Sequence, residues 1–382
     1  MTTTHAPPPA SPAAPTAGRR TVPSALLVAG AAALALAAAP LLLDEFRLGL
    51  LTRYLCYAIA AVGIAVAWGR GGMLTLGHGV FFGIGAYAMA AHMTLANTPD
   101  GGLPSFMVWN GLEALPALWV PFRSLAATLA AVVLLPGAVA LLLGWAVFRR
   151  RVRGAYFAIL NQALAAAFAI LLVGQQHLTG GSSGLTDLPV LAGFDLTAPG
   201  AGLWLYALVA AVLLGVWAGY SRLMDSRYGA LLVAVRDSEE RVRFLGYDPT
   251  WVKTSAYVLS AVAAGAAGAL FVPVTGIITP ALVGVIPSIQ LVLMAALGGR
   301  YSLIGAAVGA VALGAAETAF SETFAGGWLY LQGALFVAVI ALAPRGLAGL
   351  AESAAAAVRR RASAAPPGAG PGAGHPVPGR KA

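Results

Sequence analysis

Long runs of apolar residues recur along this chain, and short polar or charged segments separate them. Most runs are close to twenty residues long, the length that an α-helix needs to cross the hydrocarbon core of a bilayer. The pattern therefore predicts about ten membrane-spanning helices. We place them at residues 24–43, 50–69, 79–96, 124–148, 155–174, 202–220, 254–277, 286–298, 302–320 and 328–344. The expected fold class is all-α, a polytopic membrane protein.

The composition agrees with a chain that lies mostly in lipid. Apolar residues make up 59% of it and charged residues only 10%, whereas soluble domains carry about 25% charged residues. Residues 1–20 and 351–382 differ from the rest, because both are rich in small residues and proline, and the second is also basic. We expect disordered tails there. Residues 21–350 are the expected transmembrane domain, with the first apolar run retained as a helix.

The basic residues are distributed unevenly between the predicted loops. With the N-terminus in the cytoplasm, only Arg47, Arg53 and Arg123 of the 23 Lys and Arg residues fall on the outer side. Cytoplasmic loops carry an excess of Lys and Arg, so we expect a multi-pass protein of the bacterial inner membrane with both termini cytoplasmic. This bias also accounts for the net charge of +9 without nucleic-acid binding. On the outer side, residues 174–201 hold two aspartates and no Lys or Arg, which suits a contact with a partner or substrate, or an ordinary turn-rich connection.

The chain lacks the sequence signs of an ATPase or a metalloenzyme. Its five histidines show no spacing typical of a metal site. Its single cysteine, Cys56, excludes an internal disulfide or a Cys-based zinc site. No Gly-Lys dipeptide occurs, so a Walker A phosphate-binding loop is absent. We therefore expect no catalytic residues, no metal and no cofactor on this chain.

Polar residues inside the predicted spans are candidates for function. They are Asn161, Gln162, Gln290 and Glu317. Polar side chains in membranes are costly and often mark a substrate path, and amides can hydrogen-bond a small neutral solute without adding charge. The alternative is hydrogen bonding between helices. The sequence leaves both interpretations open.

The largest predicted cytoplasmic segment, residues 221–253, contains a short amphipathic helix. Asp237 is placed to cap it, with Glu240 three residues later as the capping-box partner. Val242 and Leu245 are expected to share an apolar face, and Gly246 is a typical stop signal. Such a helix suits the docking of a partner, although a solvated surface helix would have a similar sequence.

Several motifs together resemble those of one family of permeases. They are GGMLTLGHGVFFGIGAYAMA, LTGGSSGLTDLP, YGALLVAVRDSEERVRFLGYDPTWVK, LGGRYSLIGAAVGA and APRGLAGL. In this order, over roughly residues 50–350, they resemble the permeases of branched-chain amino acid ABC importers. Within that family, LPSFMVWN, VPF and YFAILNQAL look most like the urea-type second permease. The two tails depart from the family pattern.

The resemblance implies an assembly and a role for several residues. The assembly contains a second homologous permease subunit, two cytoplasmic ATPase subunits that hold the ATP, and an extracytoplasmic solute-binding protein. The coupling helix that contacts the ATPase would include Asp237, Glu240, Arg241, Val242, Phe244, Leu245 and Gly246. Close backbone packing in a Gly-rich re-entrant segment would require Gly77, Gly79, Gly83 and Gly85, with His78 in the polar wall of the substrate path.

The expected function is therefore that of a permease subunit in an ATP-driven importer for urea or short amides. Two alternatives stay open. A branched-chain amino acid permease would share everything except the solute. A stand-alone urea or amide channel would need no docking helix.

Overall fold

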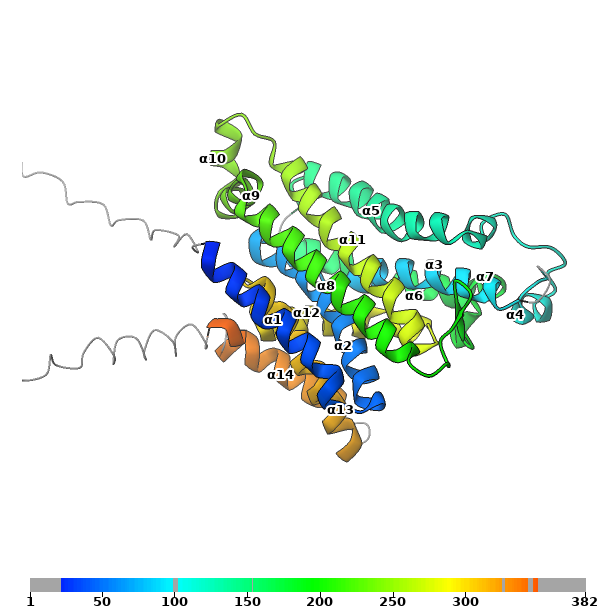
Figure 1. Cartoon of the computed structure of the whole chain (residues 1–382). Helices are drawn as coiled ribbons and strands as arrows, with labels where there is room; N and C mark the ends of the chain where they lie inside the picture. The colour runs from blue at the N-terminus through cyan, green and yellow to red at the C-terminus, as the bar shows by residue number, and fades with distance from the viewer. Residues whose placement is uncertain (1–21, 99–101, 153, 325–326, 343–345, 350–382) are drawn as a thin grey trace, which may run out of the picture. The chain divides into compact units, whose positions relative to one another are not determined.

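A computed structural model describes residues 22–98, 102–152, 154–324, 327–342 and 346–349 (Figure 1). The predicted tails, residues 1–20 and 351–382, lie outside the described residues. The chain divides into a first unit up to Asp44, which contains α1 (Val22–Leu42), and a second, compact unit that begins at Glu45. The second unit carries every site discussed below.

The second unit is almost entirely helical, in agreement with the predicted fold class. Its longer helices are α2 (Glu45–Ile64), which continues as the π-helical η1 (Ala65–Arg70), α3 (His78–Ala96), α5 (Leu125–Arg149), α6 (Ala155–Gly174), α8 (Ala201–Asp225), α9 (Arg227–Asp237), α11 (Pro249–Thr275), α12 (Val285–Gly298), α13 (Leu303–Thr323) and α14 (Trp328–Leu342). Its short elements are α4 (Ser105–Trp109), η3 (Val120–Arg123), α7 (Gln176–Thr179), η4 (Gly181–Ser183), β1 (Val190–Leu191), β2 (Phe194–Asp195), α10 (Glu239–Phe244) and η5 (Pro280–Leu282).

The predicted spans coincide with helices, but not all of these are equally long. Among the described residues, eight helices are long and apolar enough to cross a membrane. The first and last predicted spans fall on α1, which is 21 residues long, and α14, which is 15 residues long. Among the described residues, helices therefore stand at all ten predicted spans.

Helix α11 forms the centre of the second unit. It packs against α2, α3 and α5, while α2 also packs against α8 and α13. Figure 1 shows α5, α8 and α11 running roughly side by side along the long direction of this unit. The largest fully buried side chains include Tyr257 and Phe271 of α11 and Phe81 of α3. The core therefore lies between α11 and the helices on either side of it.

Small residues allow these central helices to approach at backbone distance. A Cβ atom added at Gly85 of α3 would lie 2.0 Å from the carbonyl oxygen of Gly265 in α11. One added at Gly268 would lie 1.9 Å from the carbonyl oxygen of Phe82. Side chains of any size are excluded at such contacts, as at other membrane helix interfaces built on small residues.

The outer helices expose apolar side chains instead of burying them. Leu134 of α5, Ile170 of α6 and Leu203 of α8 are all more than half exposed. Soluble proteins rarely expose contiguous apolar surfaces of this kind, whereas the lipid-facing sides of membrane helices normally do. The burial pattern therefore agrees with a helix bundle that sits in lipid.

The Gly-rich segment consists of a non-helical stretch followed by a long helix. Residues 71–77 follow η1 without helical structure, and α3 then begins at His78 and continues for 19 residues, enough to span a bilayer. Gly72 has a φ of 70° and lies against the side chain of Arg236. The glycines of α3 lie at packed positions and do not interrupt the helix, and re-entry of residues 71–77 into the membrane stays a prediction.

The loops at the end of α11 opposite α10 are ordered. Strands β1 and β2 form a two-stranded antiparallel hairpin, and an isolated bridge between Leu185 and Ile278 ties this region to the segment after α11. Hydrogen bonds from the hydroxyl and backbone N–H of Thr197 lower the pKa of the Asp195 carboxyl, which is fully exposed.

Candidate functional site: the α9–α10 elements and the polar groups of the core

Helix α10 begins one residue later than the sequence predicts. Asp237 is the last residue of α9, and its carboxylate accepts a hydrogen bond of 2.9 Å from Nε of Arg236. The N-cap of α10 is Ser238, whose backbone is extended, and no side chain caps the helix. The predicted capping box of Asp237 and Glu240 is therefore wrong, because α9 already includes Asp237.

The C-terminal end of α10 closes with a left-handed residue. Gly246 has a φ of 87°, and its N–H donates to the carbonyl of Arg243 at 2.9 Å. The N–H of Tyr247 donates to the carbonyl of Val242 at 3.3 Å. This pair of bonds is the Schellman arrangement, in which glycine is favoured because it adopts positive φ without strain.

The apolar residues of α10 divide into a buried anchor and an exposed group. Val242 is only 3% exposed, whereas Leu245 is 75% exposed and Phe244 is 90% exposed. The predicted shared face of Val242 and Leu245 is therefore wrong, since Leu245 is the C-cap residue, where helical spacing ends. Tyr247 and Trp251 are also more than half exposed. These four exposed residues, Phe244, Leu245, Tyr247 and Trp251, form what we call the α10 apolar tip.

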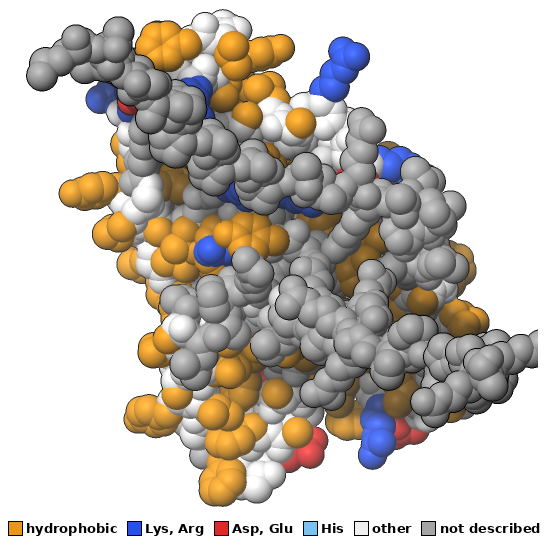
Figure 2. Space-filling model, turned by 90° about the vertical axis from the view of Figure 1, so that its left-hand side faces the viewer, with side chains coloured by type: hydrophobic (Ala, Val, Ile, Leu, Met, Phe, Trp, Pro, Cys, Tyr) orange, Lys and Arg blue, Asp and Glu red, His pale blue; other side chains and the backbone are white. Residues whose placement is uncertain are grey.

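The α10 apolar tip lies at one extremity of the second unit. Helix α10 is at the top left of Figure 1, beside α9 and the beginning of α11. Figure 2 shows the left-hand face, and hydrophobic side chains project from its top, at the height of α10. Phe244, Leu245 and Tyr247 lie outside the long helices, and large exposed apolar side chains there mark a surface suited to contact with another protein.

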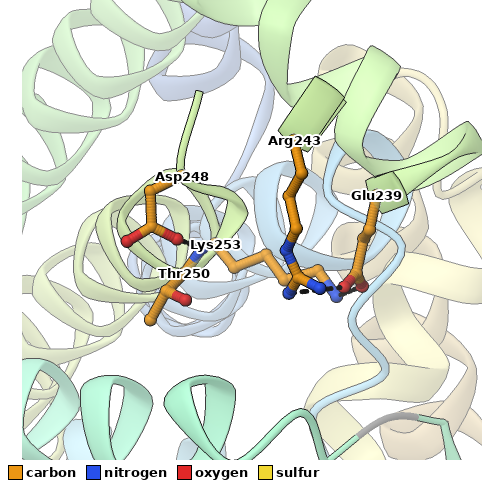
Figure 3. Close-up of polar contacts among 5 residues, drawn as sticks. All are labelled: Glu239, Arg243, Asp248, Thr250 and Lys253. Atoms are coloured by element: carbon orange, nitrogen blue, oxygen red, sulfur yellow. Dashed lines mark hydrogen bonds and ion pairs between the residues drawn. The ribbon is translucent and has the colours of Figure 1, made fainter. Parts of the chain in front are cut away.

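An ion-pair network fastens α10 to the beginning of α11 (Figure 3). Lys253 of α11 donates to Glu239, the first residue of α10, and Arg243 lies 3.9 Å from the same carboxylate. The ammonium of Lys253 also lies 5.7 Å from the ring centre of Phe148. The backbone N–H of Thr250 donates to Asp248, which caps α11 ahead of Pro249. The ion pairs of Glu239 with Lys253 and Arg243 hold α10 against the N-terminal end of α11.

Helix α9 makes two further polar contacts to the core. Arg236 donates to the carbonyl of Gly69 at 3.0 Å, next to the end of η1. The Tyr228 hydroxyl lies 2.8 Å from that of Ser255 in α11. Burial raises the pKa of the Tyr228 hydroxyl above its ordinary value. The pair α9–α10 is thus bonded to both α11 and the helix formed by α2 and η1.

Two of the predicted path residues meet in one buried cluster. Nε2 of His78 lies 2.6 Å from the hydroxyl of Ser260, and the ring of His78 packs edge-on to Tyr257. The Tyr257 hydroxyl donates to Asn161, whose amide N–H₂ donates to the carbonyl of Phe157. Asn161 therefore joins α6 to α11, which is the interhelical role that the sequence left open. Its neighbour Gln162 has a buried Oε1 without a partner among the described residues.

The other two path residues lie elsewhere and bind each other. Gln290 of α12 donates to Glu317 of α13. Glu317 interacts electrostatically with Arg53 of α2, whose guanidinium lies 5.9 Å from the ring centre of Tyr57. The predicted path residues therefore form two separate groups rather than one line.

The four glycines of the Gly-rich segment all lie at close contacts. A Cβ at Gly77 would be 2.4 Å from the carbonyl oxygen of Asn161, and one at Gly79 would be 2.4 Å from the hydroxyl of Ser288. Gly83 faces Phe168 and Val283. Gly85 faces Gly265 of α11, as described above. Their requirement for transport stays a prediction.

Comparison with known proteins places this arrangement in a family. The model of the branched-chain amino acid transport system / permease component matches residues 46–343. The chain belongs to this family. It is thus a multi-pass membrane permease, a non-enzymatic component, in agreement with the resemblance and the expectations above.

Individual relatives match over most of the chain. The high-affinity branched-chain amino acid transport system permease protein LivM of Salmonella typhimurium is 27% identical over 333 residues, which is 81% of this chain and 71% of the relative. LivH, a permease protein of a system with the same name in that organism, is 25% identical over 313 residues, which is 78% of this chain and 92% of the relative. No solved structure matches the chain.

Sequence reasoning missed several residues of these groups. Glu239 and Lys253 lie in the predicted loop, and Lys253 is one of only two lysines in the chain, which was an available signal. Tyr257 and Ser260 carry no such signal, because nothing in an apolar helix indicates which helix its polar side chains will meet.

Proposed function

We propose that this chain is a permease subunit of an ATP-driven importer of branched-chain amino acids. In the assembly it pairs with a second homologous permease, and two cytoplasmic ATPase subunits supply the energy. An extracytoplasmic binding protein delivers the solute. The chain sits in the bacterial inner membrane with both termini and the α10 apolar tip in the cytoplasm, and ATP binds only to the partner subunits.

The observation that carries this proposal is an exposed apolar tip on a rigidly anchored helix. Phe244 and Leu245 project into solvent, while Val242 and the Glu239–Lys253 ion pair hold α10 in place. Because this chain has no Walker A loop, an ATP-driven role requires contact with a subunit that binds ATP. A docked helix that is fixed to the core can transmit a rigid-body movement.

The contacts supply a direct route from that helix into the core. Lys253 belongs to α11, which is packed against α2, α3 and α5. Arg236 bonds to Gly69 at the end of η1. A displacement of α9 and α10 therefore acts at once on α11 and on the helix that α2 and η1 form.

The substrate is proposed on the names of the relatives and on the chemistry of the core. Both relatives named above are permeases for branched-chain amino acids, and this favours the amino acid over urea. The urea-type resemblance rests on three short motifs and gains no support from these relatives. The amides that suggested a neutral polar solute also bind other side chains, since Asn161 pairs with Tyr257 and Gln290 with Glu317.

The similarity of this chain to two different permease proteins supports a second permease subunit in the assembly. This chain aligns with LivM and with LivH, two permease proteins of systems that share one name in one organism. Two related permeases in one such system fit a heterodimer, so a LivH-like chain is the proposed partner here.

The test is energised uptake in proteoliposomes that contain the chain, its partner permease and the ATPase subunits. With binding protein outside and ATP inside, we expect uptake of radiolabelled leucine and none of radiolabelled urea. Omission of the ATPase subunits is the control and should abolish uptake. Uptake of urea but not of leucine would contradict the proposed substrate. Uptake without the ATPase subunits would show a stand-alone channel.

A further inference from the structure

The second unit contains a cavity of about 480 Å³ at the end opposite α10. It lies between the first turns of α2 and the last turns of α11, and Leu282 of η5 closes part of it. Leu50, Phe271 and Val274 line it with apolar surface, and Arg53 contributes the one cationic side chain in its wall. A cavity of this size falls within the range of small-molecule sites, about 300–1,000 Å³.

Arg53 lies in this wall with an unpaired donor. Its buried Nε has no hydrogen-bond partner among the described residues. Its guanidinium lies 5.8 Å from the ring centre of Phe271, a residue of the same wall. The guanidinium also hydrogen-bonds with Tyr57 and interacts electrostatically with the carboxylate of Glu317. An arginine held against aromatic rings in a cavity wall is suited to bind a carboxylate, because its planar fork matches that group.

The other residues of the cavity wall indicate which kind of carboxylate ligand fits. Apolar side chains from both helices offer a surface for an aliphatic group, and Glu45 lines the same cavity two helical turns before Arg53. A wall with one cation, one anion and an aliphatic surface matches a zwitterion with a branched apolar side chain. Urea has neither a carboxylate nor an aliphatic group.

We propose that this cavity binds an aliphatic α-amino acid, with its carboxylate on Arg53 and its side chain against Leu50, Phe271 and Val274. The inference rests on the proposed importer function and adds to it a binding site on the membrane subunit itself. The solute is thus recognised a second time after the binding protein releases it.

Gly49 offers a way to test the site without transport. It lines the cavity, and a Cβ added there meets no atom within 4 Å. Gly49→Cys therefore places a thiol in the cavity, whereas the natural Cys56 is fully buried, so the parent chain is the unlabelled control. The measurement is the rate of labelling by a small thiol reagent in membranes that hold the full-length chain. Gly215→Cys on α8, also in open space, is the control position.

Leucine should slow the labelling of Gly49→Cys and leave that of Gly215→Cys unchanged. Isoamylamine, which lacks the carboxylate, and urea should protect only at concentrations at least about tenfold higher, the scale of one charge-assisted hydrogen bond. Adding Arg53→Gln should raise the half-protecting leucine concentration by a similar factor. Arg47→Gln, which removes the same charge from an exposed position on the same helix, should not.

Equal protection with and without Arg53, or equal protection by leucine and isoamylamine, would overturn the site. If leucine uptake still depends on the ATPase subunits in that case, the proposed function stands without it. If leucine protects Gly49→Cys but the complete importer transports no leucine, the cavity is confirmed and the proposed function fails.

Discussion

Lys253, near the start of α11, forms an ion pair with Glu239, the first residue of α10 (Figure 3). The two side chains are only 11% and 12% exposed. Since the pair joins the helix that carries the α10 apolar tip to the central helix of the second unit, it is the contact through which the tip would act on the core.

Glu239→Gln should weaken this connection. The change leaves the Lys253 ammonium buried without a counter-charge, which typically costs about 3–5 kcal/mol. We expect ATPase subunits to bind less well, and substrate-stimulated ATP hydrolysis and leucine uptake to fall together. The measurement is ATP hydrolysis by the purified complex with and without loaded binding protein.

Two variants control for this effect. Asp237→Asn breaks the neighbouring but exposed pair with Arg236 and should cost at most about 1 kcal/mol. The double variant Glu239→Gln with Lys253→Met removes both charges and should recover part of the activity. Equal activity of Glu239→Gln and Asp237→Asn would refute a role for the buried pair.

The orientation of the chain follows from its charges and is testable by itself. Reporter fusions at residues 110, 190 and 235 should give outside, outside and inside signals. The physical reason is that segments rich in Lys and Arg stay on the cytoplasmic side. An inside signal at residue 190 would contradict the orientation and would place the α10 apolar tip on the wrong side for an ATPase.

Gly79→Leu should abolish uptake while the protein still inserts into the membrane. A Cβ there would lie 2.4 Å from the Ser288 hydroxyl and 2.5 Å from the carbonyl oxygen of Val283. Overpacking of this kind typically costs about 1–3 kcal/mol and shifts the backbone. Leucine uptake, normalised to the amount of protein in the membrane, is the measurement. A Cβ added at Gly215 of α8 meets no atom within 4 Å, so the control variant Gly215→Leu should transport leucine normally. Normal transport by both variants would rule out a steric role for Gly79.

Asn161 and Gln162 are adjacent in sequence but should differ in effect. Asn161→Leu leaves the buried Tyr257 hydroxyl without its acceptor, which typically costs about 1–3 kcal/mol, so the yield of folded protein should fall. Gln162→Leu removes a side chain whose Oε1 has no partner among the described residues, so it should slow uptake without lowering the yield. Thermal stability in detergent and uptake, measured on both variants, separate the two roles. A loss of stability in Gln162→Leu would show that this residue too joins helices.

The helices were predictable because a continuous run of apolar residues indicates each of them. Runs of apolar residues near twenty long identify α5 and α6 almost to the residue, whereas α8 continues five residues beyond the predicted end. The boundary between α9 and α10 was not predictable to one residue, since Asp237 and Ser238 are both good N-cap residues and only packing decides that Asp237 stays in α9.

The polar groups of the core were predictable as residues but not as partners. His78 meets Ser260 across 182 positions, and Asn161 meets Tyr257 across 96. Helix packing alone sets such contacts, and an apolar sequence does not encode which faces meet. For the same reason Arg53 was counted only as an outer charge, although in the structure it lines a cavity.

We infer that a partner ATPase binds α10 and transmits its conformational change through this helix. Co-purification of the ATPase subunits with the Leu245→Asp variant is the test of this inference. Leu245 is 75% exposed, so the change should not disturb the fold of the chain. It would place a charge in an apolar interface, at a cost of several kcal/mol, and should therefore lower ATPase binding by about a hundredfold or more. Leu245→Met is the matched control and should bind as the parent does. The account predicts that the ATPase is lost, together with stimulated hydrolysis, only from Leu245→Asp; full co-purification and full stimulation in that variant would contradict it and leave α10 a solvated helix.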